Sequence, residues 1–113
     1  QVNPRSNCIF TQGLEGALRC PIAHGEGRFV ASPEQLDALL KAERVPIFYD
    51  GGSYPANPNG SLSNIAGLTN AKGNILGLMP HPENNIFSWQ ADLSEPAPLS
   101  GLALFTNVLR NLK

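Results

Sequence analysis

The stretch from Asp50 to Ser63, D-G-G-S-Y-P-A-N-P-N-G-S-L-S, restricts the possible folds more than any other part of the chain. Glycine, proline, asparagine and serine dominate it, and these residues favour turns over helices and strands. The same bias runs through all 113 residues, which include 11 glycines and 10 prolines. A loop this long inside a small domain is usually functional or disordered. We therefore expect one domain of short elements joined by many turns and ordered loops.

The predicted strands are short apolar runs between turn signals. Ile65–Thr69 and Asn74–Met79 flank a glycine-containing turn at 70–73, a pattern that predicts a β-hairpin. Three further strands are predicted, at Cys8–Phe10, Leu18–Ala23 and Val45–Tyr49. Pro21 and Pro46 cannot donate to a ladder, so the last two of these strands belong at a sheet edge or end there.

Two helices are predicted. Ser32 can cap the first, Pro33 fits its first turn, and Gln35 completes a capping box, so this helix runs to about Ala42. The second starts at Ser100 and is amphipathic. Its apolar face carries Leu102, Phe105, Val108, Leu109 and Leu112.

Charge and composition exclude several classes of function. The net charge is -1, charged residues make up 15% of the chain, and no run of lysine or arginine stands out. These features argue against a nucleic-acid or anionic membrane surface, and no apolar stretch is long enough to cross a bilayer. The spacing of Cys8 and Cys20 suits neither zinc nor a redox pair, so we expect reduced, buried thiols in a cytoplasmic protein, with one structural disulfide as the alternative. We expect no cofactor.

The chain contains two His-x-Glu pairs, His24-Gly25-Glu26 and His81-Pro82-Glu83. Each can be a polar turn whose histidine satisfies nearby backbone groups. A metal site built from both pairs is possible in principle, but two side chains on one tight turn diverge, and we predict no metal. The third reading is catalysis, because a histidine at a strand end, oriented by a carboxylate, is the base half of a nucleophile–histidine–acid triad.

Four sequence blocks together resemble a known family. They are P-I-A-H-G-E-G-R (Pro21–Arg28), Y-P-A-N-P-N-G-S (Tyr54–Ser61), I-A-G-L-T-N (Ile65–Asn70) and G-L-M-P-H-P-E (Gly77–Glu83). In content, order and spacing they are similar to the glutamine amidotransferase subunits of phosphoribosylformylglycinamidine synthase, which belong to the class I, triad-type amidotransferases of purine biosynthesis. The opening V-N-P-R-S-N-C-I-F-T and the final S-G-L-A-L-F-T-N-V-L extend the resemblance over essentially the whole chain.

This resemblance implies an α/β fold, namely the C-terminal part of a flavodoxin-like class I glutamine amidotransferase. Residues 1–113 would form a single partial domain, with a mixed sheet, a β-hairpin and two main helices. Members of the family hydrolyse glutamine and pass ammonia to a synthase partner. By motif match, His81 is the general base and Glu83 its orienting acid.

The resemblance also implies a substrate-binding segment. His24, Gly25 and Glu26 match the segment that helps to line the glutamine pocket. The turn Asn57–Ser61 has the sequence of the family too. Its asparagines either tie down backbone groups as a rigid turn network or contact the synthase partner, and the sequence leaves both possibilities open.

The departures from the family matter as much as the matches. The N-terminal half of the family, with its oxyanion-hole glycines and G-x-C-N-G nucleophile elbow, has no counterpart here, and Asn84 stands where the family commonly has arginine. Neither cysteine has the flanking glycines of an elbow. A thioester mechanism needs a thiolate, so we expect no ordinary glutaminase activity from the chain alone.

The missing half would also uncover apolar surface, including Ile75, Leu76 and Leu78, and such surface invites pairing. We therefore expect a homodimer or a complex with the missing half. The first residue is Gln1 rather than Met, which suggests a chain cut from a longer one. The alternative function is a stand-alone, non-catalytic module for binding or assembly, and the third is a metal protein.

Overall fold

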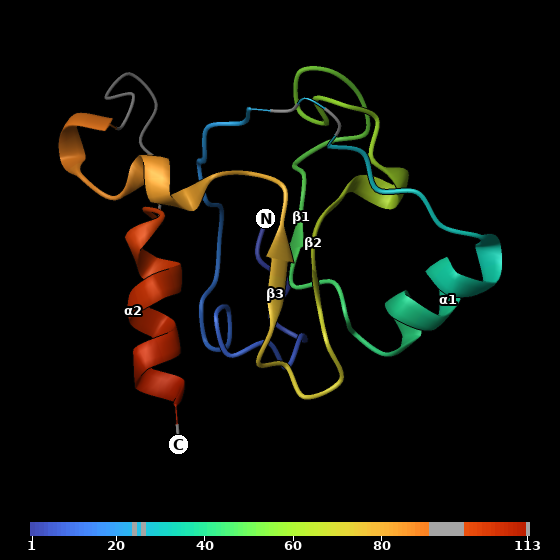
Figure 1. Cartoon of the computed structure of the whole chain (residues 1–113), viewed down its shortest axis with the longest axis horizontal. Helices are drawn as coiled ribbons and strands as arrows, with labels where there is room; N and C mark the ends of the chain where they lie inside the picture. Colours follow the sequence, from blue (N-terminus) through green and yellow to red (C-terminus); the bar gives the residue numbers. More distant parts are fainter. Residues whose placement is uncertain (24, 26, 91–98, 113) are drawn as a thin grey trace.

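The computed structural model describes residues 1–23, 25, 27–90 and 99–112. A small three-stranded sheet stands at the centre, with helix α1 (Pro33–Lys41) on one side and helix α2 (Leu102–Asn111) on the other (Figure 1). Much of the described chain consists of turns and loops, as its content of glycine and proline predicts. The two helices and the sheet together confirm the expected α/β class.

The sheet consists of β1 (Ile47–Phe48), β2 (Ile65–Thr69) and β3 (Leu76–Leu78) in the order β1-β2-β3. Both pairings are antiparallel. The predicted hairpin is confirmed, although its second strand is shorter than expected. The expected mixed sheet is corrected, because the parallel pairing in the described chain is a single bridge between Leu18 and Leu99.

The turn between β2 and β3 is fixed by Asn70. Its side-chain oxygen accepts hydrogen bonds from the backbone N–H groups of Asn74, at 3.0 Å, and Ile75, at 3.2 Å. Gly73 has φ 72°, a left-handed conformation that favours glycine, and a β-carbon there would collide with the backbone of Asn7. The turn therefore joins the hairpin to the N-terminal segment.

Two predicted strands are wrong and a third is shorter. Residues 8–10 enter a turn, in which the carbonyl of Cys8 accepts from the N–H groups of Thr11, at 3.0 Å, and Gln12, at 2.8 Å. Residues 18–23 make one isolated bridge instead of a ladder. The third predicted strand, Val45–Tyr49, is shorter than expected. It begins only after Pro46, which lacks the N–H group that a ladder needs, and forms β1.

The first helix forms as its sequence predicts. Ser32 and Gln35 form the reciprocal capping box, with the Gln35 N–H donating to Ser32 Oγ at 3.2 Å and the Ser32 N–H donating to Gln35 Oε1 at 3.0 Å. None of the residues of α1 is buried. The helix is therefore stabilised by its own ends more than by packing.

The second helix also forms, but the side chains that it buries are not those of the predicted apolar face. Leu104 and Asn107 are its buried residues. The Asn107 amide donates to the carbonyls of Ile9, Phe10 and Gln12 at 3.2, 3.1 and 3.0 Å, and so ties α2 to the N-terminal turn. The exposed part of the apolar face, named here the outer face of α2, comprises Leu102, Phe105, Leu109 and Leu112.

The core is small. Ile47, Ala66 and Leu104 are buried together, one each from β1, β2 and α2. The half-buried side chains that pack against them are Phe10, Leu14, Leu18, Tyr49 and Leu78. Within the described residues, no helix is long and apolar enough to cross a membrane.

Candidate active site

The turn that carries His81 continues directly from the sheet. Beyond the end of β3, the Met79 N–H still donates to the carbonyl of Ala66 at 2.9 Å. The His81 N–H then donates to the carbonyl of Pro21, also at 2.9 Å. A 3₁₀ helix, Pro82–Asn85, follows at once, with proline in its first turn where the missing N–H costs nothing.

The side chains of His81 and Glu83 lie in direct contact. The distance from His81 Nδ1 to Glu83 Oε1 is 2.7 Å, and the two side chains are 38% and 53% exposed. The hydrogen bond from His81 lowers the pKa of Glu83, and backbone hydrogen bonding lowers it further. The carboxylate is therefore ionised at neutral pH and accepts from His81, which puts the proton of a neutral imidazole on Nδ1 and leaves Nε2 unprotonated.

Two residues that sequence reasoning missed hold this turn from behind. Asn85 is buried, and its side-chain amide donates to the carbonyl of Arg19. The Gly101 N–H donates to the carbonyl of Asn85 at 2.8 Å. Gly101 also lies so close to Pro82 that a β-carbon there would collide with the proline backbone. Both roles depend on contacts distant in sequence, so no local pattern indicated them.

Neither cysteine is an activated nucleophile. Cys8 is fully buried. Burial raises the pKa of Cys20 to about 11, with a further contribution from the charge of Glu83. Catalytic cysteines need the opposite shift, toward the thiolate. In the described part of the chain, His81 and Glu83 are therefore in contact with each other, and neither cysteine is placed as a reactive thiolate.

His81 and Glu83 line a cavity of about 370 Å³. The rest of its lining is apolar: Phe10, Leu76, Leu78, Pro80, Pro82, Leu104 and Phe105. His81 and Glu83 therefore lie on the wall of a hollow between β3 and α2.

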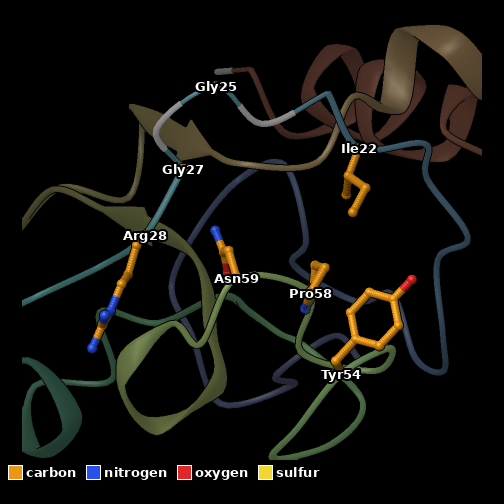
Figure 2. A pocket seen from close by; sticks show the side chains of 7 residues that line it. All are labelled: Ile22, Gly25, Gly27, Arg28, Tyr54, Pro58 and Asn59. Carbon is orange, nitrogen blue, oxygen red and sulfur yellow. The ribbon is translucent and has the colours of Figure 1, made fainter.

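The other predicted pair is only partly visible. His24 and Glu26 lie outside the described residues, so the predictions for them cannot be placed. Gly25 lines a separate cavity of about 610 Å³, with Ile22, Gly27, Arg28, Tyr54, Pro58 and Asn59 (Figure 2). The linings of this cavity and of the His81 cavity share no residue. In the described part of the chain, no group of three or more histidine, cysteine, aspartate or glutamate side chains could hold a metal ion.

The N-P-N-G-S turn is held by Asn57 and Ser61. The Asn57 amide donates to the carbonyl of Ser61 at 2.9 Å, and Asn57 Oδ1 accepts from the Ser61 N–H at 3.0 Å. Ser61 Oγ donates to the carbonyl of Ile65 at 2.6 Å and accepts from the Phe29 N–H at 3.2 Å. These two residues form the rigid turn network that was one of the two possibilities.

The sequence model of the CobB/CobQ-like glutamine amidotransferase domain matches residues 1–110. Because the match covers nearly the whole chain, the chain belongs to this family of glutamine amidotransferase domains. The His81–Glu83 contact at the end of β3 is the feature of the fold that suits such chemistry.

Individual proteins of known name are also similar to this chain. Phosphoribosylformylglycinamidine synthase subunit PurQ of Treponema denticola is 48% identical over 111 residues, covering 88% of this chain and 41% of that protein. PurQ of Dehalococcoides mccartyi is 41% identical, covering 96% and 45%. The solved structure of PurLQS from Thermotoga maritima superposes with a TM-score of 0.69 at 29% identity, over 99% of this chain and 45% of that one.

These comparisons confirm the predicted resemblance to the glutaminase subunit of the synthase and to part of its fold. The chain spans less than half the length of the relatives it matches. The roles of His81, Glu83 and the His24–Glu26 segment stay predictions.

Proposed function

We propose that this chain supplies the histidine–glutamate half of a glutaminase site and that the cysteine comes from sequence outside these 113 residues. The observation that carries the proposal is the 2.7 Å contact between His81 Nδ1 and Glu83 Oε1 on the wall of the cavity between β3 and α2. We define the complementing polypeptide as the part of the Treponema denticola PurQ that this chain does not match. Residues 1–113 are then a single partial domain.

The chemistry assigns one task to each residue. Glu83 accepts from His81 Nδ1, so His81 Nε2 is free to take the proton of the incoming thiol. The resulting thiolate attacks the carboxamide carbon of glutamine, and ammonia leaves with the proton that His81 returns. Water then hydrolyses the thioester to glutamate. The ammonia passes to a synthase partner in the cytoplasm, in keeping with the names of the relatives.

Exposed apolar side chains form a surface to which the complementing polypeptide could bind. The outer face of α2 is exposed, as is Ile75 beside β3. Ile47, Ala66 and Leu78, one from each strand of the sheet, line a further cavity of about 670 Å³. Apolar surface and a free strand edge of this kind favour association. Without its complement, the chain is expected to cover them by forming a homodimer, which sedimentation at micromolar concentration measures.

The test is reconstitution of glutaminase activity. The chain and the complementing polypeptide are mixed, and glutamate release is measured. The mixture should be active, and His81→Ala or Glu83→Gln should each lower its activity by about 10²- to 10⁴-fold. Asn84→Ala is the matched control, because Asn84 is exposed and its backbone N–H contact to His81 survives the substitution.

A non-catalytic binding or assembly module is the second candidate, favoured by the raised pKa of Cys20. A mixture that assembles stably but releases no glutamate would support this second candidate and refute the first.

A further inference from the structure

The turn that begins at His81 is tied to a distant part of the chain at two points. The His81 N–H donates to the carbonyl of Pro21 at 2.9 Å, and the side-chain amide of Asn85 donates to the carbonyl of Arg19. The two acceptors are close in sequence, so one short stretch of main chain spans both ends of the turn. Residues 17–21 are named here the bracing segment.

The bracing segment is itself held in place. Leu18 packs against the core and forms an isolated bridge with Leu99. The Leu99 N–H donates to the carbonyl of Ala17 at 3.2 Å, and the Gly101 N–H donates to the carbonyl of Asn85 at 2.8 Å. Asn85 therefore joins the bracing segment, through its side-chain amide, to the start of α2, through its main-chain carbonyl.

The orientation of the His81 ring depends on this main chain. The side chains of His81 and Glu83 are 38% and 53% exposed, so packing alone does not fix them. The direction of the imidazole follows instead from the backbone of the turn and from the 2.7 Å contact with Glu83. Catalytic groups need to be held to within about 0.5 Å, and the hydrogen bonds of residues behind them supply much of that precision.

The amide of Asn85 suits this task because it fixes a direction. Asn85 is only 6% exposed, and a buried carboxamide costs free energy unless it is hydrogen-bonded. An apolar side chain could fill the same space, but it could not hold a carbonyl group in one orientation. By holding the carbonyl of Arg19, the amide also holds the carbonyl of Pro21, which accepts from the His81 N–H.

From these contacts we infer that Asn85 is a positioning residue that orients the His81 imidazole toward Glu83 through the main chain of the bracing segment. The inference rests on the proposed function, in which His81 is the base. A misplacement of about 1 Å can lower the rate of a reaction about 10²-fold. Loss of the amide should therefore lower kcat and leave the KM for glutamine nearly unchanged.

The experiment compares two variants of Asn85 in the full chain with a matched control. Asn85→Leu removes the amide at similar volume, and Asn85→Ala removes it without the risk of overpacking. Asn3→Ala is the control, because Asn3 is also buried and its amide also donates to a distant main-chain carbonyl, that of Val45 at 2.9 Å. An NMR pH titration of the Glu83 carboxyl is recorded for each chain alone and for His81→Ala. The kcat and the KM for glutamine are measured in the mixture with the complementing polypeptide.

The hydrogen bond from His81 lowers the pKa of Glu83, so the midpoint of the titration reports whether the imidazole stays in place. We expect both Asn85 variants to raise the Glu83 midpoint most of the way toward its value in His81→Ala. They should also lower kcat at least about tenfold, with the KM changed less than about threefold. Asn3→Ala should lower the melting temperature and leave the Glu83 midpoint and kcat unchanged.

An unchanged Glu83 midpoint in both Asn85 variants would overturn the inference. An equal loss of kcat in Asn3→Ala, or failure of both Asn85 variants to fold where Asn3→Ala folds, would also overturn it, because Asn85 would then be a structural residue only. The titration needs no glutaminase activity. It therefore still decides the role of Asn85 when the wild-type mixture releases no glutamate, a result that refutes the proposed function.

Discussion

Gly101→Ala tests whether the turn behind His81 is as tightly packed as the structure indicates. Gly101 has φ -58° and ψ -29°, angles that suit any residue, and it is the N-cap of α2 rather than an interior residue, so alanine gains no helix propensity there. The added β-carbon, however, would collide with the backbone of Pro82. Backbone atoms in a packed turn move aside less easily than the end of a flexible side chain. The cost therefore lies toward the upper end of the overpacking range, about 3 kcal/mol.

The expectation for Gly101→Ala is a loss of about 3 kcal/mol in the free energy of unfolding, or a melting temperature lower by about 12 °C. Urea denaturation measures it, and NMR of the His81 ring reports whether the Glu83 contact shifts. Gly77→Ala in β3 is the control, because its β-carbon would come no closer than 3.9 Å to the carbonyl oxygen of Leu68. A Gly101→Ala chain as stable as the wild type would refute this account of the turn.

Three further outcomes follow from the structure. The hydrogen bond from His81 lowers the pKa of Glu83, so their contact should persist as pH falls through the ordinary carboxyl range and break only below it. An NMR titration should give Glu83 a lower midpoint in the wild type than in His81→Ala; equal midpoints would contradict the contact. Cys20, with its pKa near 11, should react with a thiolate-selective reagent at pH 8 about 10²-fold more slowly than free cysteine and faster as pH rises; a free-cysteine rate would contradict its burial. Asn107→Leu leaves the carbonyls of Phe10 and Gln12 without this donor, while the carbonyl of Ile9 keeps a 3.4 Å contact from Asn111. It should lower the free energy of unfolding by about 3 kcal/mol in urea, whereas an unchanged value would mean that α2 docks without this amide.

The parts of the fold that the sequence predicted correctly are those fixed by local interactions. The capping box of Ser32 and Gln35 and the hairpin around Asn70 depend on residues within a few positions of one another. A strand, in contrast, needs a neighbour. Residues 8–10 and 18–23 have strand-like composition, but the sheet offers them no adjacent strand to complete a ladder. Their backbone groups are used in turns and an isolated bridge instead.

In the candidate site too, the contacts between residues near in sequence were predicted and those between distant residues were not. His81 and Glu83 are two residues apart on a turn stiffened by proline, so their proximity was readable from sequence. The supports of that turn were not, because Asn85 contacts residue 19 and Gly101 contacts residue 82. The pattern of apolar residues also did not predict which face of α2 packs against the rest of the chain. Its most apolar face is exposed, and a buried asparagine, Asn107, makes the docking contact.

We propose that His81 and Glu83 are the base and the acid of a glutaminase site whose thiolate comes from outside these 113 residues. Glutamate release by the purified chain, with and without the complementing polypeptide, tests it most directly. We predict no release above background from the chain alone and release from the mixture that His81→Ala abolishes. Release by the chain alone, lost in His81→Ala, would contradict the claim, because the nucleophile would then lie within these 113 residues.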